Sequence, residues 1–288
     1  DGIRDLIVTG VQTCALPISD DMFFPEKLEK LISLFEKDPE LGLGAGNSIL
    51  IDDDGDPIGK TYGDGVPTQD ADWLNGNRFH VGSVLVKRCW LQKVDPFDES
   101  LRACEDWDMW LRLAIAGCKM AWLPENVSKY RVHGHQMTRE SIRMKTAMLA
   151  VLDKTFERAD LPASWRAKSE GAKSQALVKA AARAFLAGDC DDAQNDLALA
   201  VRLTPSLADN ESQALLDSLL GWAFSPSSAD PLEYMHQVFD HLPPTLSISP
   251  ETEKKMLGQL AENLVFENDA LGEIQRSHQY EIGRASCR

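Results

Sequence analysis

Apolar residues recur with two different spacings along the chain, and they predict a mixed α/β part followed by a helical part. The first helical spacing begins near Pro25, which suits the first turn of a helix, and an Asp-Pro pair after residue 37 ends it. Its apolar stripe consists of Leu28, Leu31, Ile32 and Phe35. This element is therefore expected to be an amphipathic helix with these side chains on its buried face.

Strand patterns follow this helix. The stretch LGLGAGNSILIDDDGDPIGK predicts a strand, a turn and a second strand, because an Asp-Gly pair between apolar runs is a hairpin signal. Residues 83–88 predict a further strand, followed by a short helix. The stretch EDWDMWLRLAIAG predicts a helix that ends at Gly117, and the chain after it predicts two short strands broken at Pro124 and Glu125.

From about residue 139 onward, strand patterns disappear, and alanine and leucine dominate between Gly- or Pro-containing turns. We expect a linking helix over 139–160 and a helical domain over 161–280. One stretch of this domain carries small residues at a fixed spacing before a proline, namely Ala181, Gly188, Ala193, Ala200 and Pro205. The spacing resembles one tetratricopeptide repeat, whose small residues let two antiparallel helices approach closely. An ordinary helical hairpin is the alternative.

The two ends of the chain differ in character from the rest. Back-translation of VTGVQTCALPI near the start and of EIGRASCR at the end gives strings that resemble a pair of sequencing adapters. A signal peptide is disfavoured because Asp1 and Asp5 stand where such a segment needs basic residues. We therefore expect residues 1–19 and 281–288 to be adapter-derived and residues 20–280 to be native.

Composition limits the range of functions. The formal net charge is −15, and the two ends do not change it, because three acidic and three basic residues cancel there. An acidic chain without basic runs disfavours nucleic acid as a partner. The four cysteines outside the ends form no CxxC pair, which favours free thiols in a reducing cytoplasm. No apolar run approaches the ~20 residues that a membrane-spanning helix needs.

Two pairs of acidic residues are candidate sites. Asp20 and Asp21 precede the first predicted helix, where adjacent carboxylates either bind a divalent cation or stabilise the helix N-terminus. Glu105 and Asp106 open a second helix, where acidic residues are usually partners of the helix dipole. The tryptophans at 107 and 110 can exclude water from this second pair. A carboxylate in a partly dry site has a raised pKa, which suits a general base.

Two histidines form the third candidate. His133 and His135 are one residue apart in a predicted strand, so they face opposite sides and at most one of them joins a given site. The alternative is that both are ordinary surface or hydrogen-bonded histidines.

In their order and surroundings, these groups resemble family 2 glycosyltransferases with the GT-A fold. The matching stretches, in chain order, are DDMFFPEKLEK, ILIDDDGDPIG, GNRFHVGSVLVKR, VDPFDESLRACEDWDMWLRLA and KYRVHGHQMT. The resemblance covers residues 20–138 and departs from the family pattern at Asp95-Pro96, where relatives have glycine before FDESL. It implies an α/β fold class: the C-terminal part of a truncated GT-A mixed sheet with helices, followed by an all-α C-terminal domain.

The resemblance implies a role for each candidate residue. Asp20 matches the second carboxylate of the DxD metal motif, and His133 stands where some relatives place a histidine that faces the metal. The implied cofactor is Mg²⁺ or Mn²⁺. Asp106 matches the catalytic base and Glu105 its orienting neighbour. The residues implied to contact substrate are Asn77, Trp107 and Asp21.

The implied activity is inverting transfer of a sugar from a nucleotide-diphospho-sugar to a hydroxyl of a saccharide, lipid-linked or protein acceptor. The family builds its nucleotide pocket largely from strands upstream of the DxD motif. We therefore expect this chain to be inactive by itself and to expose an unpaired sheet edge. The resemblance implies a cytoplasmic location, with peripheral attachment to the inner membrane as an alternative.

Two other functions stay open. One is a helical-repeat scaffold that carries a degenerate transferase half, in which the helical domain binds a protein partner. The other is a metal-dependent phosphotransferase or hydrolase on a similar sheet. A scaffold has no chemical need for the carboxylates at 20, 105 and 106 beside tryptophans, which favours the transferase.

Overall fold

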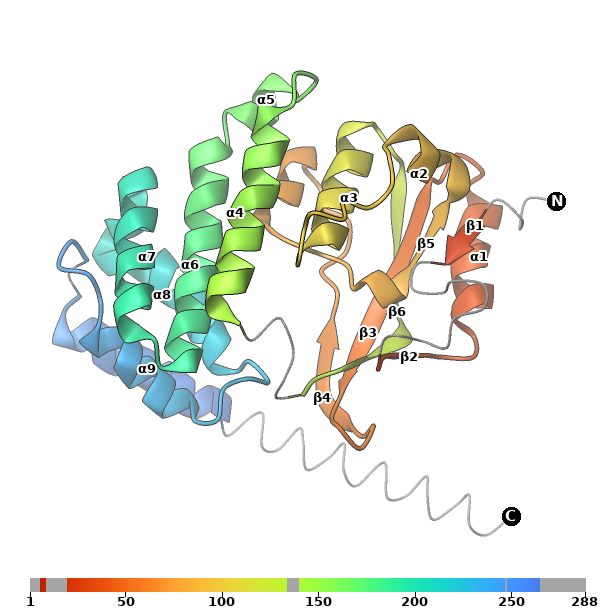
Figure 1. Cartoon of the computed structure of the whole chain (residues 1–288). Coiled ribbons are helices and arrows are strands. Elements are labelled where there is room, and N and C mark those ends of the chain that lie inside the picture. Colours follow the sequence, from red (N-terminus) through yellow and green to blue (C-terminus); the bar gives the residue numbers. More distant parts are fainter. Residues whose placement is uncertain (1–5, 9–19, 134–139, 247, 265–288) are drawn as a thin grey trace, which may run out of the picture. The chain divides into compact units, whose positions relative to one another are not determined.

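The computed structural model describes residues 6–8, 20–133, 140–246 and 248–264 (Figure 1). The chain forms two compact units, Asp1–Ala180 and Ala181–Arg288. The boundary between the units falls within the long helix α6, Ser169–Ala187.

The first unit is built on a mixed sheet. Its strands are β1 Leu6–Val8, β2 Met22–Phe23, β3 Leu43–Ile51, β4 Pro57–Tyr62, β5 Val84–Lys87 and β6 Met120–Arg131. They follow the order β1, β5, β3, β6, β2, and β4 pairs with the second half of β3. β3 and β6 are parallel, whereas the other pairs are antiparallel. The mixed α/β class predicted from the sequence is therefore confirmed at this coarse level.

Helices cover both faces of this sheet. They are α1 Lys27–Lys37, α2 Arg88–Lys93, α3 Glu105–Ile115, α4 Ser141–Glu157, α5 Ala163–Arg166 and the first part of α6, with short 3₁₀ turns η2 Asp70–Asn75 and η3 Val81–Ser83. Successive side chains of a strand point to opposite faces. Accordingly, Leu85 of β5 packs with α1, while Val84 and Val86 pack with α3. Figure 1 shows α1 on one side of the sheet and α3 and α4 on the other.

The predicted hairpin is present as β3 and β4. In its turn, the Asp52 carboxylate accepts hydrogen bonds from the backbone N–H groups of Asp54 and Asp56, at 3.1 and 2.9 Å. Gly55 adopts a φ of 92°, which side chains other than glycine rarely adopt. The Asp-Gly pair therefore places the turn where the sequence predicted it.

The predicted break at Pro124 is wrong, because β6 is one continuous strand. Gly46 of β3 pairs with Leu123, whereas the next residue, Asn47, pairs with Asn126. Residues 124 and 125 are therefore extra residues in a bulge, where a proline is tolerated. Leu28 also departs from expectation, since it is 45% exposed while Leu31 and Phe35 are buried.

One end of the sheet is closed by β1, but an unpaired edge of the kind that we expected is present along β6. β1 pairs antiparallel with β5, with Leu6 opposite Lys87 and Val8 opposite Leu85. The outermost strands of this path, β1 and β2, have only three and two residues. Because β2 pairs only with Ser128 and Lys129, the outer edge of β6 over residues 120–126 has no strand partner among the described residues. Such an edge can pair with another chain and is an aggregation hazard.

The predicted linking helix is α4, but it belongs to the first unit rather than between domains. The α4 side chains Met148, Val151 and Leu152 share one core with Trp107 and Trp110 of α3. Leu161, Trp165 and the first part of α6 extend the same core. The helical unit therefore begins at residue 181 and not at residue 161.

The second unit is helical throughout its described residues. It contains the end of α6, α7 Cys190–Leu203, η5 Pro205–Ala208, η6 Asn210–Ser212, α8 Gln213–Ala223, α9 Pro231–Asp240 and a helix over 250–264. Ala181, Ala193 and Ala200 are fully buried, and Gly188 has a φ of 81° just after α6 ends. The three alanines thus lie on a buried face, as predicted for a close helical pair, whereas Gly188 is exposed where α6 ends. Within the described ranges, no helix is long and apolar enough to cross a membrane.

Candidate functional site

Asp106 lies in the first turn of α3, held by two hydrogen bonds. Its carboxylate accepts one from Asn77 Nδ2 at 2.6 Å and one from the backbone N–H of Trp107 at 2.7 Å. The acidic residues at the start of α3 suit the positive end of the helix dipole. The resemblance implied a substrate contact for Asn77, and the structure places its side-chain amide on the Asp106 carboxylate, although the two residues are far apart in the chain.

The surroundings of Asp106 make it an unusually basic carboxylate. Burial, followed by the neighbouring charge of Glu105, raises the pKa of Asp106 to about 6. The hydrogen bonds from Asn77 and Trp107 act in the opposite direction and limit the rise of this pKa. The raised pKa predicted from the sequence is thus found, and the contribution of Glu105 to it is electrostatic.

Hydrogen bonds to neighbouring segments hold the loop that carries Asn77. The Tyr62 hydroxyl of β4 donates to the Asn77 carbonyl at 3.1 Å, and the Asn77 side-chain oxygen accepts from the Phe79 N–H at 3.3 Å. Arg78 donates to the Gly65 carbonyl at 2.8 Å. Asn77 is therefore presented to Asp106 by a loop with little freedom to move.

Asp20 and His133, the two residues predicted to bind a metal, lie next to each other. Asp20 Oδ2 and His133 Nε2 are 3.0 Å apart, and both side chains are partly exposed. Two adjacent ligands on one octahedral ion with ligand distances of 2.0–2.1 Å are also about 3 Å apart, so the pair fits two positions on such an ion. Among the described residues, no group of three or more His, Cys, Asp or Glu side chains converges on a metal site. His135 lies outside the described residues.

Asp21 is placed differently from the substrate contact predicted for it. Its carboxylate interacts with His80 Nε2 at 3.1 Å and accepts from the backbone N–H of Arg131 at 2.9 Å. The Arg131 side chain also donates to the Asp20 carbonyl at 3.0 Å and to the Asp52 carbonyl at 2.6 Å. Asp21 and Arg131 therefore fix the segment that presents Asp20, and Asp21 itself is mostly buried.

His80 is a functional-site residue that the sequence did not single out. Its Nδ1 lies 3.0 Å from the Ser48 hydroxyl, which in turn lies 2.7 Å from the Ser128 hydroxyl. Its ring stacks on Tyr130 with centroids 4.6 Å apart. Partners on three different elements define this site, and no local spacing in the sequence could have indicated them.

The segment from Asn77 to His80 links the two predicted carboxylate groups. Asn77 binds Asp106, while His80 binds Asp21, the neighbour of Asp20. The charge of His80 also lowers the pKa of Asp106, so the two groups share one electrostatic environment. The segment from Asn77 to His80 therefore contacts Asp106 at one end and Asp21 at the other.

Trp107 is not available to a substrate in the way the sequence predicted. Its side chain is 2% exposed, and its indole N–H donates to the Trp73 carbonyl at 2.9 Å. Its contribution to the site is the backbone N–H that holds Asp106 and the apolar bulk beside it. Trp107 is thus a core residue that shapes the surroundings of the carboxylate.

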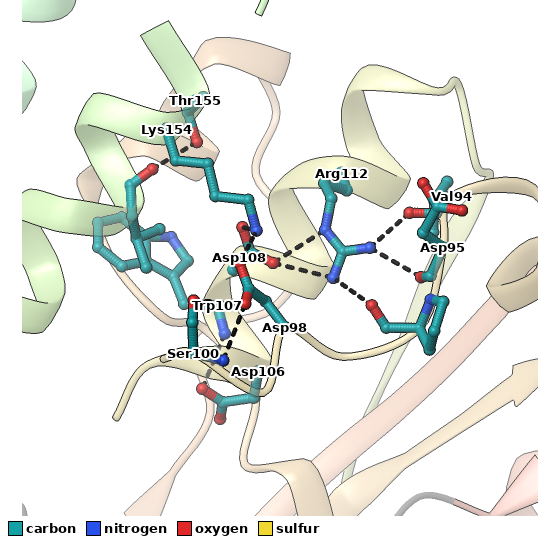
Figure 2. A network of polar contacts seen from close by, with 12 residues as sticks. Val94, Asp95, Asp98, Ser100, Asp106, Trp107, Asp108, Arg112, Lys154 and Thr155 are labelled. Atoms are coloured by element: carbon teal, nitrogen blue, oxygen red, sulfur yellow. Dashed lines mark hydrogen bonds and ion pairs between the residues drawn. The ribbon is translucent and has the colours of Figure 1, made fainter. Parts of the chain in front are cut away.

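A network of charged side chains lies just behind this part of α3 (Figure 2). Asp108 interacts with Arg112 of the same helix at 2.8 Å and with Lys154 of α4 at 2.9 Å. Lys154 also contacts Asp98, in the loop before α3, at 2.6 Å.

Neither the protein-family models nor the curated protein sequences give a match to this chain.

Proposed function

We propose that the first unit carries the acceptor-side half of an inverting, metal-dependent glycosyltransferase of the GT-A type. The observation that carries this proposal is the carboxylate of Asp106, held by Asn77 and by the Trp107 amide, with a pKa near the physiological range. A pKa close to the working pH suits a general base. The neighbouring Asp20–His133 pair supplies the side of the site on which a sugar nucleotide would bind.

Asp106 acts on the acceptor in this proposal. It takes the proton of the acceptor hydroxyl while that oxygen forms a bond to the anomeric carbon of the donor sugar. The bond from that carbon to the nucleotide diphosphate breaks, and the diphosphate leaves with the electron pair. A single displacement inverts the configuration at the anomeric carbon. General-base catalysis of this kind typically contributes about 10²–10⁴ in rate.

Asp20 and His133 would hold the Mg²⁺ or Mn²⁺ ion that the resemblance implies. Such an ion, when bound, acts as a Lewis acid that stabilises the charge on the departing diphosphate. The protein's own contribution is the placement of the two ligands, which Arg131 and Asp21 secure by fixing the chain at position 20.

Replacement of Asp106 by asparagine tests the assignment. In a longer protein that also contains the segment upstream of Asp20, D106N should lower the rate of sugar transfer at least ~10²-fold. It should leave donor binding largely unchanged, because Asp106 faces the acceptor. The exposed turn residue Asp54 provides a matched control, and D54N should keep normal turnover.

The stability of D106N separates loss of chemistry from loss of folding. The folded-state pKa of Asp106 lies above its usual value of 3.8, so ionisation of Asp106 opposes folding as pH rises from about 4 to about 6. Part of the residue reaches solvent, so we expect D106N to gain only about 1–2 kcal/mol of unfolding free energy at pH 7. A D106N enzyme with normal turnover would refute the assignment and favour the scaffold alternative.

A further inference from the structure

Lys154 of α4 joins two carboxylates that lie on either side of the start of α3. Its Nζ is 2.6 Å from Asp98 Oδ2 and 2.9 Å from Asp108 Oδ1 (Figure 2). The resemblance to glycosyltransferases ends near residue 138, so Lys154 lies outside every motif that points to the site.

The buried carboxylate of Asp108 needs these cations. Asp108 is 1% exposed, and its two oxygens interact with Arg112 on one side and Lys154 on the other. Loss of one partner of a buried charge cluster is costly, because the remaining charge stays in a poorly solvated place. With Lys154 removed, the carboxylates of Asp98 and Asp108 would also repel each other.

The same network fixes the loop in front of α3. Asp98 Oδ1 accepts hydrogen bonds from the backbone N–H and the hydroxyl of Ser100, at 3.0 and 2.6 Å. Arg112 donates to the carbonyls of Asp95 and Pro96 at 2.8 and 3.1 Å. Both the loop and the first turn of α3 are therefore anchored through this cluster.

Asp106 lies two residues before Asp108 in that first turn. Its hydrogen bond from Asn77 requires the start of α3 to stay in register with the Asn77 loop, whereas the bond from the Trp107 amide is local to the helix turn. A displaced helix start would weaken the bond from Asn77.

We propose that Lys154 is a positioning residue for Asp106, so that α4 is a working part of the site and not a linker. The importance of this positioning for catalysis rests on the proposed function, but the positioning itself can be measured without any enzyme assay.

The test is an NMR pH titration of the Asp106 carboxyl carbon in the full chain. In the natural sequence, the midpoint is expected at about 6. In K154M it should rise by about half a unit or more, because the hydrogen bond from Asn77 lowers the pKa of Asp106 and is weakened. K154R, which keeps the charge and can reach both carboxylates, should restore the midpoint.

Lys173 supplies a matched control. It pairs with Asp153, the neighbour of Lys154 in α4, but the Asp153 carboxylate is half exposed, whereas Asp108, the partner of Lys154, is buried. K173M should leave the Asp106 midpoint unchanged. A midpoint in folded K154M equal to that of the natural sequence would overturn the proposal, as would a shift of the same size in K173M.

If K154M does not fold, K154Q takes its place in the titration. Glutamine keeps a hydrogen-bond donor for Asp98 but removes the charge, and the same rise in the Asp106 midpoint is expected. General loss of stability does not move the pKa of a carboxyl in the folded state, so the titration separates positioning from mere support of the fold. A shifted midpoint together with an active D106N enzyme would refute the proposed function and leave the positioning role intact.

Discussion

At the scale of single residues, the network stabilises a strained backbone conformation at Asp95. This residue stands where the glycosyltransferase pattern that the chain resembles has glycine, and it adopts a φ of 66°. This region costs an L residue about 1–2 kcal/mol, and aspartate is among the side chains that tolerate it best. The guanidinium of Arg112 binds the carbonyl of Asp95, which holds the strained conformation in place.

Lys27 shows a second residue-scale effect, a buried charge that opposes folding. It is 2% exposed, its Nζ donates to the Gly82 carbonyl at 2.7 Å, and it lies 3.5 Å from the centre of the Phe23 ring. Burial lowers the pKa of Lys27 to about 7, against a usual value of 10.5. Between these two pH values the unfolded chain binds a proton that the folded chain does not, so stability rises with pH.

Replacement of Lys27 by methionine should remove this pH dependence. We expect K27M to be more stable than the natural sequence below pH 7, by about 1–2 kcal/mol after the lost bond to Gly82 is counted. The difference should shrink as pH rises toward 10. Urea unfolding of both proteins at pH 6, 8 and 10 measures it, and parallel stability curves would contradict the pKa shift.

The candidate site was predictable from sequence only in part. Asp106 and the Asp20–His133 pair follow from motifs, because each motif carries the residue types that its chemistry needs. His80 and Lys154 were missed, because they act through partners 59 and 46 residues away, and no local pattern encodes such pairs. Trp107 was predicted to contact substrate, because the sequence does not show that its side chain is buried in the core.

At the scale of elements, regular apolar spacing predicted helices and strands well, whereas a single proline gave a wrong prediction of a strand end. α1, α3 and the β3–β4 hairpin form where apolar spacing or an Asp-Gly pair indicated them. Pro124 indicated a break, yet β6 absorbs it as a bulge, because the parallel partner β3 continues past it on both sides. Helical spacing also identified α4 correctly. The apolar positions of α4 show that one of its faces is buried, but they do not show that this face packs on α3.

That packing predicts where the first unit can be cut. A protein of residues 20–180 should fold cooperatively, whereas one of residues 20–138 should not. The shorter protein loses five large buried side chains of the shared core, namely Met148, Val151, Leu152, Leu161 and Trp165. At about 1.5–3 kcal/mol each, their loss costs roughly 8–15 kcal/mol, which equals the whole stability of a typical domain.

Near-ultraviolet circular dichroism and binding of a hydrophobic dye distinguish the two proteins. Residues 20–180 should give a sharp thermal transition with little dye bound, and residues 20–138 should bind dye without such a transition. A cooperative transition in the shorter protein would show that α4 is a linker after all.

At the scale of the whole molecule, the coarse α/β class and the helical second part were predictable, but the boundary between them was not. Composition changes from about residue 139 and the helical domain was expected from residue 161, whereas the second compact unit begins at residue 181. Composition indicates whether a segment forms a helix or a strand. It does not indicate which helices and strands share a core, and the boundary between two units depends on that. The helices between these positions look like the second part in sequence and pack with the first.

The last prediction concerns donor binding by the complete 288-residue chain. A nucleotide-diphospho-sugar carries two negative charges and the chain carries a net charge of −15, so we expect a metal ion to bridge the two. Asp20 and His133 can fill two positions on such an ion. The resemblance, however, implies that the nucleotide itself is bound largely by strands upstream of the DxD motif. Calorimetry with UDP- and GDP-sugars and Mn²⁺ should therefore show no micromolar binding, whereas a longer protein with the upstream segment should bind. Micromolar binding by the 288-residue chain that disappears in D20A would instead place a complete donor site within these residues.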